Sequence, residues 1–96
     1  MPRVRRSAIL VNSQGLHARP ITKMIEIARK HRAALVVSCG GVRADGRRIL
    51  EMMGLAALPG AVLEFEADGD DAEALVAELE RLVADRFGED PPPSPA

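Results

Sequence analysis

The sequence predicts an α+β fold, in which a four-stranded antiparallel sheet is covered on one face by three helices. The first observation is that four segments have the β-branched content or alternation of strands, namely 4–11, 34–39, 42–45 and 61–67. The second is that segments with helical spacing of apolar residues lie between or after them, at 18–32, at 47–56 and after residue 70. The resulting order, β-α-β-β-α-β-α, gives two layers with the apolar helix faces turned toward the sheet.

The length and composition predict one small domain. Its 96 residues are 47% hydrophobic and 28% charged, as expected of a soluble globular protein. We assign the domain to residues 1–88 and expect the Pro-rich segment 89–96 to be a disordered tail. No apolar run is long enough to cross a membrane. The lack of Trp and Tyr argues against binding of single-stranded nucleic acid, and no nucleic-acid partner is expected. The one cysteine, Cys39, is expected to be a small buried residue in a cytoplasmic protein.

Charge is distributed unevenly along the chain although the net charge is only −1. Nearly all Lys and Arg residues lie in the first half, and nearly all acidic residues lie in the second half. Such polarity either steers charged partners or is cancelled when folding interleaves the two halves. The sequence leaves these alternatives open.

The first helix is predicted from apolar residues at positions i, i+3, i+4 and i+7, which are Ile21, Met24, Ile25 and Ala28. Pro20 lies in its first turn, where a missing N–H group costs nothing. His31 is expected to be a solvated residue at the end of this helix, among basic neighbours that favour the negative end of the helix dipole.

The remaining elements follow from turn and capping signals. Gly40-Gly41 predicts a tight hairpin between the second and third strands. Asp70 is expected to be the N-cap of the last helix, with Glu73 completing a capping box. Six apolar residues at helical spacing are assigned to the core, namely Ala72, Leu75, Val76, Leu79, Leu82 and Val83.

The residues Gly15-Leu16-His17-Ala18-Arg19-Pro20 place a histidine where the first strand has ended and the first helix begins. The unpaired N–H groups and the positive dipole end of a helix start attract anions. The same dipole disfavours an imidazolium, so we expect His17 to be a neutral nucleophile. Arg19 supplies a permanent cation whose geometry suits phosphate oxygens. This grouping predicts a histidine that accepts a phosphoryl group.

This motif, followed by Ile49-Leu50-Glu51-Met52-Met53-Gly54-Leu55, resembles HPr, the histidine-containing phosphocarrier family of the phosphoenolpyruvate-dependent phosphotransferase system. The resemblance covers residues 4–88 and implies an open-faced β-sandwich. It implies that His17 receives a phosphoryl group from enzyme I, ultimately from phosphoenolpyruvate, and passes it to a downstream protein of the sugar-uptake or regulatory branch. Arg19 and the backbone N–H groups of Ala18 and Arg19 would hold the phosphoryl oxygens. The chain would thus be a monomeric phosphoryl-transfer intermediate rather than a turnover enzyme, without cofactor or metal.

The resemblance also implies a docking surface for partner proteins. Ile49, Leu50 and Met53 match positions where the family exposes an apolar patch, although all three could instead be core residues. Arg48 stands where many members carry a serine that a regulatory kinase phosphorylates, so that regulation is not expected here. Arg47 and Arg48 are expected to add positive potential near His17 and to favour an acidic partner.

Two other function classes remain as alternatives. One is an HPr-like regulatory binding module that docks partners without being phosphorylated, although the intact His17 and Arg19 count against it. The other is an unrelated domain that binds a small molecule, which would want more convergent polar groups than one His and one Arg. Two histidines without nearby carboxylates in sequence are too few for a metal site.

Overall fold

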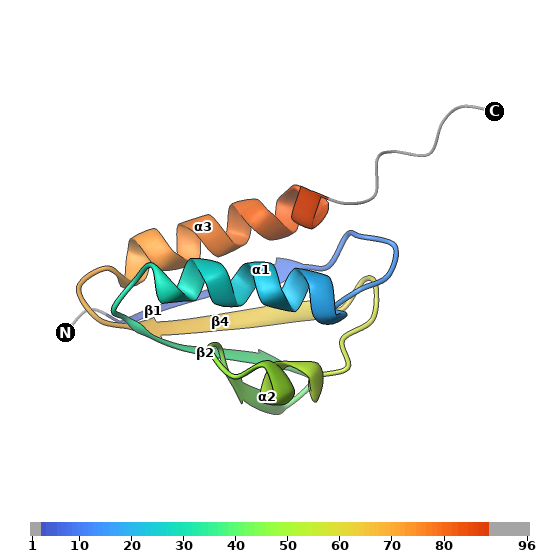
Figure 1. Cartoon of the computed structure of the whole chain (residues 1–96), viewed down its shortest axis with the longest axis horizontal. Coiled ribbons are helices and arrows are strands. Elements are labelled where there is room, and N and C mark those ends of the chain that lie inside the picture. The colour runs from blue at the N-terminus through green and yellow to red at the C-terminus, as the bar shows by residue number, and fades with distance from the viewer. Residues whose placement is uncertain (1–2, 89–96) are drawn as a thin grey trace.

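The protein is a four-stranded antiparallel sheet with helices on one face, as predicted. The computed structural model describes residues 3–88, so the predicted tail at 89–96 lies outside the described residues. The elements in chain order are β1 (Arg3–Ile9), α1 (Ala18–Arg29), β2 (Ala34–Cys39), β3 (Val42–Asp45), α2 (Ile49–Met53), β4 (Val62–Asp68), α3 (Ala72–Ala84) and the 3-10 turn η1 (Arg86–Gly88). The strand order is β1-β4-β2-β3, and every neighbouring pair is antiparallel (Figure 1).

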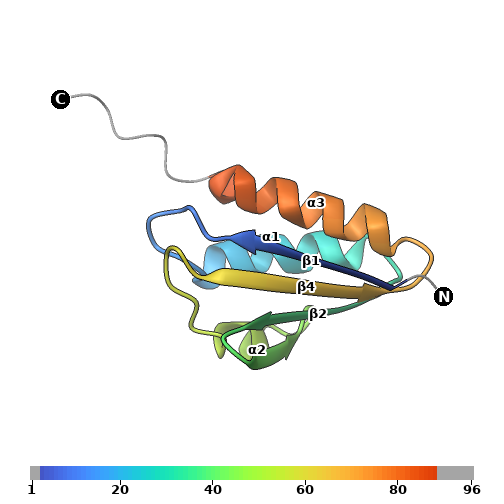
Figure 2. The same ribbon diagram turned by 180° about the vertical axis from the view of Figure 1, so that it is seen from behind.

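The core lies between the sheet and the helices. Seen from behind, the strands face the viewer and the helices lie beyond them (Figure 2). Along β4, Leu63, Phe65 and Ala67 are fully buried, whereas Glu64 between them is exposed. The predicted apolar positions of α1 are buried against this face. Burying a Leu or Phe side chain stabilises the fold by about 1.5–3 kcal/mol, so this layer is the main source of stability.

The open face of the sheet carries ion pairs between the two halves of the sequence. Arg5 Nη2 lies 3.5 Å from Glu64 Oε2, and Arg43 Nη2 lies 3.3 Å from Glu66 Oε1. Arg3 also pairs with Glu66. Exposed pairs of this kind contribute only about 0–1 kcal/mol each. They do show that folding interleaves basic residues of the first half with acidic residues of the second.

Several element ends differ from the predicted ones by one to three residues. The first strand stops at Ile9, because Leu10 exchanges backbone hydrogen bonds with the loop at Gly60 and Ala61. The short helix covers only Ile49–Met53. After it, the N–H groups of Leu55 and Ala56 bond to carbonyl groups three residues earlier, and Ala56 has a positive φ of 48°. The start of β1 and both ends of β4 also differ by a single residue from prediction.

The first helix ends at Arg29 rather than at residue 32, and an arginine side chain binds the carbonyl groups at this end and in the turn that follows. The Nη2 atom of Arg47 lies 2.7 Å, 2.8 Å and 2.9 Å from the carbonyl oxygens of Ala28, His31 and Ala33, respectively. The last carbonyl groups of a helix have no partner within the helix. Arg47 therefore acts as a side-chain cap that holds the turn between α1 and β2.

The predictions for His31 and for the capping box were wrong. His31 is not solvated: its side chain is only 11% exposed, with Nε2 2.9 Å from Glu78 Oε1 and Nδ1 3.4 Å from Asp71 Oδ2. Asp71, not Asp70, precedes α3, and its side chain makes no capping bond there. Its carboxylate instead accepts hydrogen bonds of 2.8 Å from the backbone N–H groups of Arg32 and Ala33.

Two residues assigned to the interior are only half-buried. Cys39, at the end of β2, packs against the edge of the core rather than within it. Leu82 of α3 behaves in the same way, because it faces a groove between α1 and α3. The other five residues of the predicted α3 stripe are fully buried or nearly so.

The role of Asp71 predicts a pH-dependent contribution to stability. Hydrogen bonds from the backbone N–H groups of Arg32 and Ala33 hold the pKa of Asp71 below its ordinary value of 3.8, although desolvation opposes them. A carboxyl group whose pKa is lowered by folding stabilises the protein above the ordinary pKa, and this stability is lost as pH falls through the lowered value. Asp71→Asn should therefore lower the free energy of unfolding at neutral pH, and the deficit should shrink below pH 3.8.

Urea unfolding measured at neutral and at acid pH tests this prediction. Asp70→Asn is the matched control, since Asp70 is the exposed neighbour and should show little change at either pH. A deficit for Asp71→Asn that stays constant with pH would contradict the assigned role of the carboxylate.

Candidate functional site: the start of helix α1

His17 is the N-cap residue of α1. Its backbone is extended, with φ −106° and ψ −173°, and its carbonyl oxygen accepts a hydrogen bond of 3.2 Å from Ile21 N–H. The first N–H groups of a helix have no acceptor within it, and here they belong to Ala18 and Arg19 because Pro20 has none. The half-buried His17 therefore stands beside donors that are oriented along the positive end of the helix dipole.

The loop before His17 is held against the loop that leads into β4. Leu16 is buried, and its N–H group donates a hydrogen bond of 2.9 Å to the carbonyl oxygen of Ala57. Gly15 has a φ of 68°, and a Cβ atom there would lie 2.6 Å from the same carbonyl oxygen. Only glycine fits a position that combines positive φ with such a close backbone approach. The two loops lie at one end of the molecule, where α1 begins (Figure 1).

The predicted site residues His17, Ala18 and Arg19 thus fall together at the first turn of α1. Ala18 and Arg19 are exposed. None of the ion pairs identified between residues 3 and 88 uses Arg19. A histidine nucleophile, backbone donors and an accessible guanidinium can together accept a phosphoryl group and balance its charge.

The predicted apolar patch is exposed, and the alternative that these residues are core is excluded. Ile49 is 43% exposed, Leu50 81% and Met53 47%, whereas the neighbouring Met52 is fully buried and anchors the short helix. Because α2 packs beside α1, the patch belongs to the same side of the fold as the site.

Leu58 is an exposed apolar residue that the sequence reasoning missed. It is 71% exposed, and its backbone packs directly against Gly15 in the loop before His17. The sequence signal that could have found it is a large aliphatic residue placed inside a Leu-Pro-Gly turn, where polar residues are usual.

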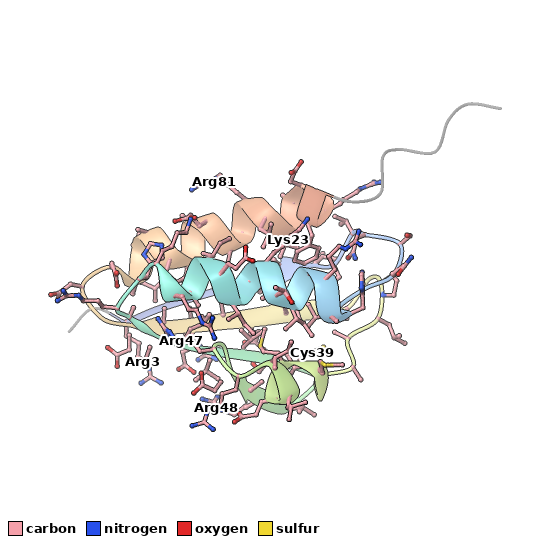
Figure 3. The ribbon with its side chains drawn as sticks, in the orientation of Figure 1. Arg3, Lys23, Cys39, Arg47, Arg48 and Arg81 are labelled. Atoms are coloured by element: carbon pink, nitrogen blue, oxygen red, sulfur yellow. The ribbon has the colours of Figure 1, made fainter. Side chains whose placement is uncertain are left out.

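The prediction that Arg47 adds positive potential near His17 was wrong. Its guanidinium is bound at the C-terminal end of α1, roughly 16 Å along the helix from His17. Arg48 instead extends away from α1 (Figure 3). It is the N-cap of α2, and its Nε lies 3.6 Å from Asp45 Oδ2 and 3.7 Å from Glu51 Oε2. The Arg48 side chain is 70% exposed, so it pairs with these carboxylates at the surface and stays accessible to solvent.

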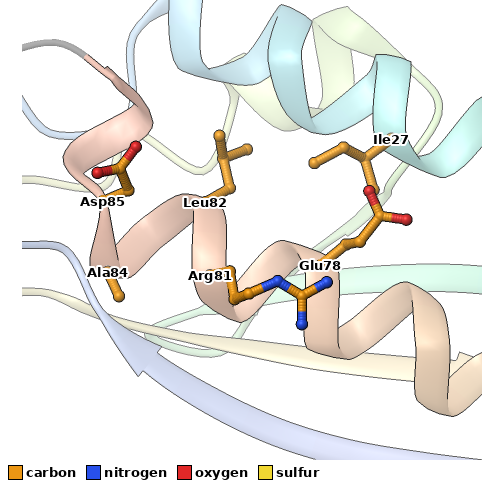
Figure 4. A pocket seen from close by; sticks show the side chains of 6 residues that line it. All are labelled: Ile27, Glu78, Arg81, Leu82, Ala84 and Asp85. Carbon is orange, nitrogen blue, oxygen red and sulfur yellow. The ribbon is translucent and has the colours of Figure 1, made fainter.

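A separate groove lies between α1 and α3. It has a volume of about 680 Å³ and is lined by Ile27, Glu78, Arg81, Leu82, Ala84 and Asp85 (Figure 4). None of the predicted site residues lines it. The groove is thus separate from the predicted site at the start of α1.

Within residues 3–88, no helix has both the length and the apolar character needed to cross a membrane. In the same part of the chain, no three or more His, Cys, Asp and Glu side chains are grouped so as to hold a metal ion.

Comparison with known proteins gives consistent matches over nearly the whole chain. The family model described as "PTS HPr component phosphorylation site" matches residues 4–85. The phosphocarrier protein HPr of Neisseria meningitidis is 38% identical over 87 residues, which are 90% of this chain and 97% of that protein. The HPr of Cupriavidus necator is 34% identical over 86 residues, with 90% and 97% covered. The crystal structure of HPr-C-His from Thermoanaerobacter tengcongensis superposes with a TM-score of 0.84 at 30% identity, covering 95% of this chain and 100% of that chain.

Proposed function

Because this chain belongs to the HPr family of the phosphotransferase system, we propose that it is a phosphocarrier whose phosphoryl group is carried on His17. The group comes from enzyme I, ultimately from phosphoenolpyruvate, and passes to a downstream acceptor protein. The observation that carries this proposal is the position of His17 as N-cap of α1, next to the N–H groups of Ala18 and Arg19.

The proposed transfer needs no cofactor and no net proton. The lone pair of a neutral ring nitrogen of His17 attacks the phosphorus atom. As the new P–N bond forms, the bond from phosphorus to the donor atom of enzyme I breaks, and its electron pair stays with that atom. The other ring nitrogen keeps its proton throughout. The guanidinium of Arg19 and the first N–H groups of α1 stabilise the anionic oxygens at the positive end of the helix dipole.

Partner proteins are proposed to dock on the apolar side chains of α2. Ile49, Leu50 and Met53 are exposed, and flexible or aliphatic side chains can repack against different partners. Leu58 extends this surface toward the loop that contains Gly15. Arg48 lies at the start of α2, where it can meet an acidic residue of a partner at the rim of the contact. Enzyme I and the downstream acceptor would use the surface in turn, each with a single copy of this chain.

Labelling with phosphoenolpyruvate and enzyme I tests the acceptor residue directly. The protein should gain one acid-labile phosphoryl group, detected by mass spectrometry under neutral or basic conditions. His17→Gln should abolish the gain. His31→Gln is the matched control because the chain has two histidines, and it should be labelled like the wild type.

An unlabelled wild-type protein would reject the carrier function and favour a module that acts by docking alone. Labelling that survives in His17→Gln and disappears in His31→Gln would move the phosphoryl group to His31 and overturn the assignment to the start of α1.

The docking surface predicts a change in KM rather than in kcat. Leu50→Ser should raise the KM of enzyme I for this protein by about 5- to 30-fold, because an exposed anchor residue contributes on the order of 1–2 kcal/mol to binding. Ile9→Ser is the control, since Ile9 is 57% exposed but lies on β1 rather than α2. Equal effects of the two substitutions on KM, measured by steady-state kinetics, would show that partners do not dock specifically on α2.

A further inference from the structure

Asn12 is the one polar residue that is fully buried among residues 3–88, with an exposed fraction of 1%. It lies in the loop between β1 and α1, five residues before His17. Burying an amide side chain is costly unless the amide forms hydrogen bonds. Asn12 Nδ2 donates a hydrogen bond of 2.7 Å to the carbonyl oxygen of Gly15. This buried amide is not one of the groups proposed to take part in the phosphoryl transfer.

The hydrogen bond from Asn12 fixes one end of a peptide group whose other end is also fixed. The carbonyl group of Gly15 and the N–H group of Leu16 belong to the same planar peptide unit. The N–H group donates to the carbonyl oxygen of Ala57 at 2.9 Å. A planar group bound at both ends cannot rotate, so ψ of Gly15 and φ of Leu16 are set together.

This fixed peptide group lies immediately before the reacting residue. Leu16 is buried, so the plane cannot move as a whole, and His17 then takes the extended backbone that starts α1. Glycine at a φ of 68° has other backbone states open to it, which would turn the carbonyl group away. The hydrogen bond from Asn12 favours the state in which the carbonyl group of Gly15 faces the buried amide.

We infer that Asn12 is a positioning residue for phosphoryl transfer. By holding the carbonyl end of the Gly15–Leu16 peptide group, it sets the orientation of the backbone at His17. This inference rests on the proposed function of His17. The buried side chain of Asn12 acts on His17 through the Gly15–Leu16 peptide group, to whose carbonyl oxygen its Nδ2 donates.

Asn12→Asp keeps the size of the side chain but replaces the NH₂ donor with an oxygen that faces the Gly15 carbonyl oxygen. The variant should lower kcat for phosphorylation by enzyme I by about 10- to 100-fold, since small misplacements of a reacting group have effects of this size. Its KM should stay close to that of the wild type, because the side chains on α2 are unchanged. The difference in kcat between this variant and the wild type should narrow at acid pH, because the introduced carboxyl group is then protonated and can donate to the carbonyl oxygen of Gly15.

Asn12→Ser provides a second variant without a buried charge, whose hydroxyl group is too short to reach the carbonyl oxygen. Val4→Ala is the stability control, because Val4 is buried at the opposite end of β1. Rates are compared at a temperature at which circular dichroism shows every variant to be folded. Val4→Ala should lower the unfolding midpoint without changing kcat, whereas Asn12→Ser should lower kcat while folded.

The ring NMR signals of His17 give an independent measure of position. They should move in the folded Asn12→Ser variant and stay unchanged in Val4→Ala. Unchanged kcat and unchanged ring signals in Asn12→Ser would overturn the inference and leave Asn12 with a purely structural role. If the wild type is not labelled at all, the proposed function fails, and the ring signals still decide whether Asn12 positions His17.

Discussion

The hydrogen bond from Leu16 N–H to the carbonyl oxygen of Ala57 is the contact on which the site depends most. It joins the loop before α1 to the loop after α2, two segments that are distant in sequence. The close approach leaves room only for glycine at position 15. It brings Leu58 beside the loop that ends at His17, and it fixes where α1 begins. The proposed acceptor histidine and part of the proposed docking surface are thereby placed together by one backbone contact.

The opposite end of α1 is held by a different kind of interaction. Arg47 binds three carbonyl groups there, while His31 and Asp71 connect the following turn to α3. Hydrogen bonds from His31 and Lys30 hold the pKa of Glu78 below its ordinary value of 4.5, so this carboxylate stays charged. The helix is thus fixed at both ends and buried along one side. A rigid helix is a suitable support for a group that must be presented in one orientation to successive partners.

Local patterns in the sequence predicted the parts of this structure that depend on local physics. The alternation of Leu63, Phe65 and Ala67 and the helical spacing in α1 predicted the strands, the helix and their buried faces. The site motif was recognisable because its chemistry lies in consecutive residues. What could not be predicted were contacts between distant segments: Asp71 with the turn after α1, or Arg47 with its end. The local pattern placed the helix cap at Asp70, next to Asp71, and made Arg47 an exposed cation. The actual partners of Asp71 and Arg47 are far away in sequence, so no local pattern reveals them.

The central claim is that the first turn of α1 is built to hold a phosphoryl group on His17. The most direct test compares backbone amide NMR spectra of the protein before and after phosphorylation by enzyme I. New hydrogen bonds to an anionic oxygen should shift the amide protons of Ala18 and Arg19 downfield, more than those of residues at the C-terminal end of α1. Unchanged Ala18 and Arg19 signals in the phosphorylated protein would contradict this account.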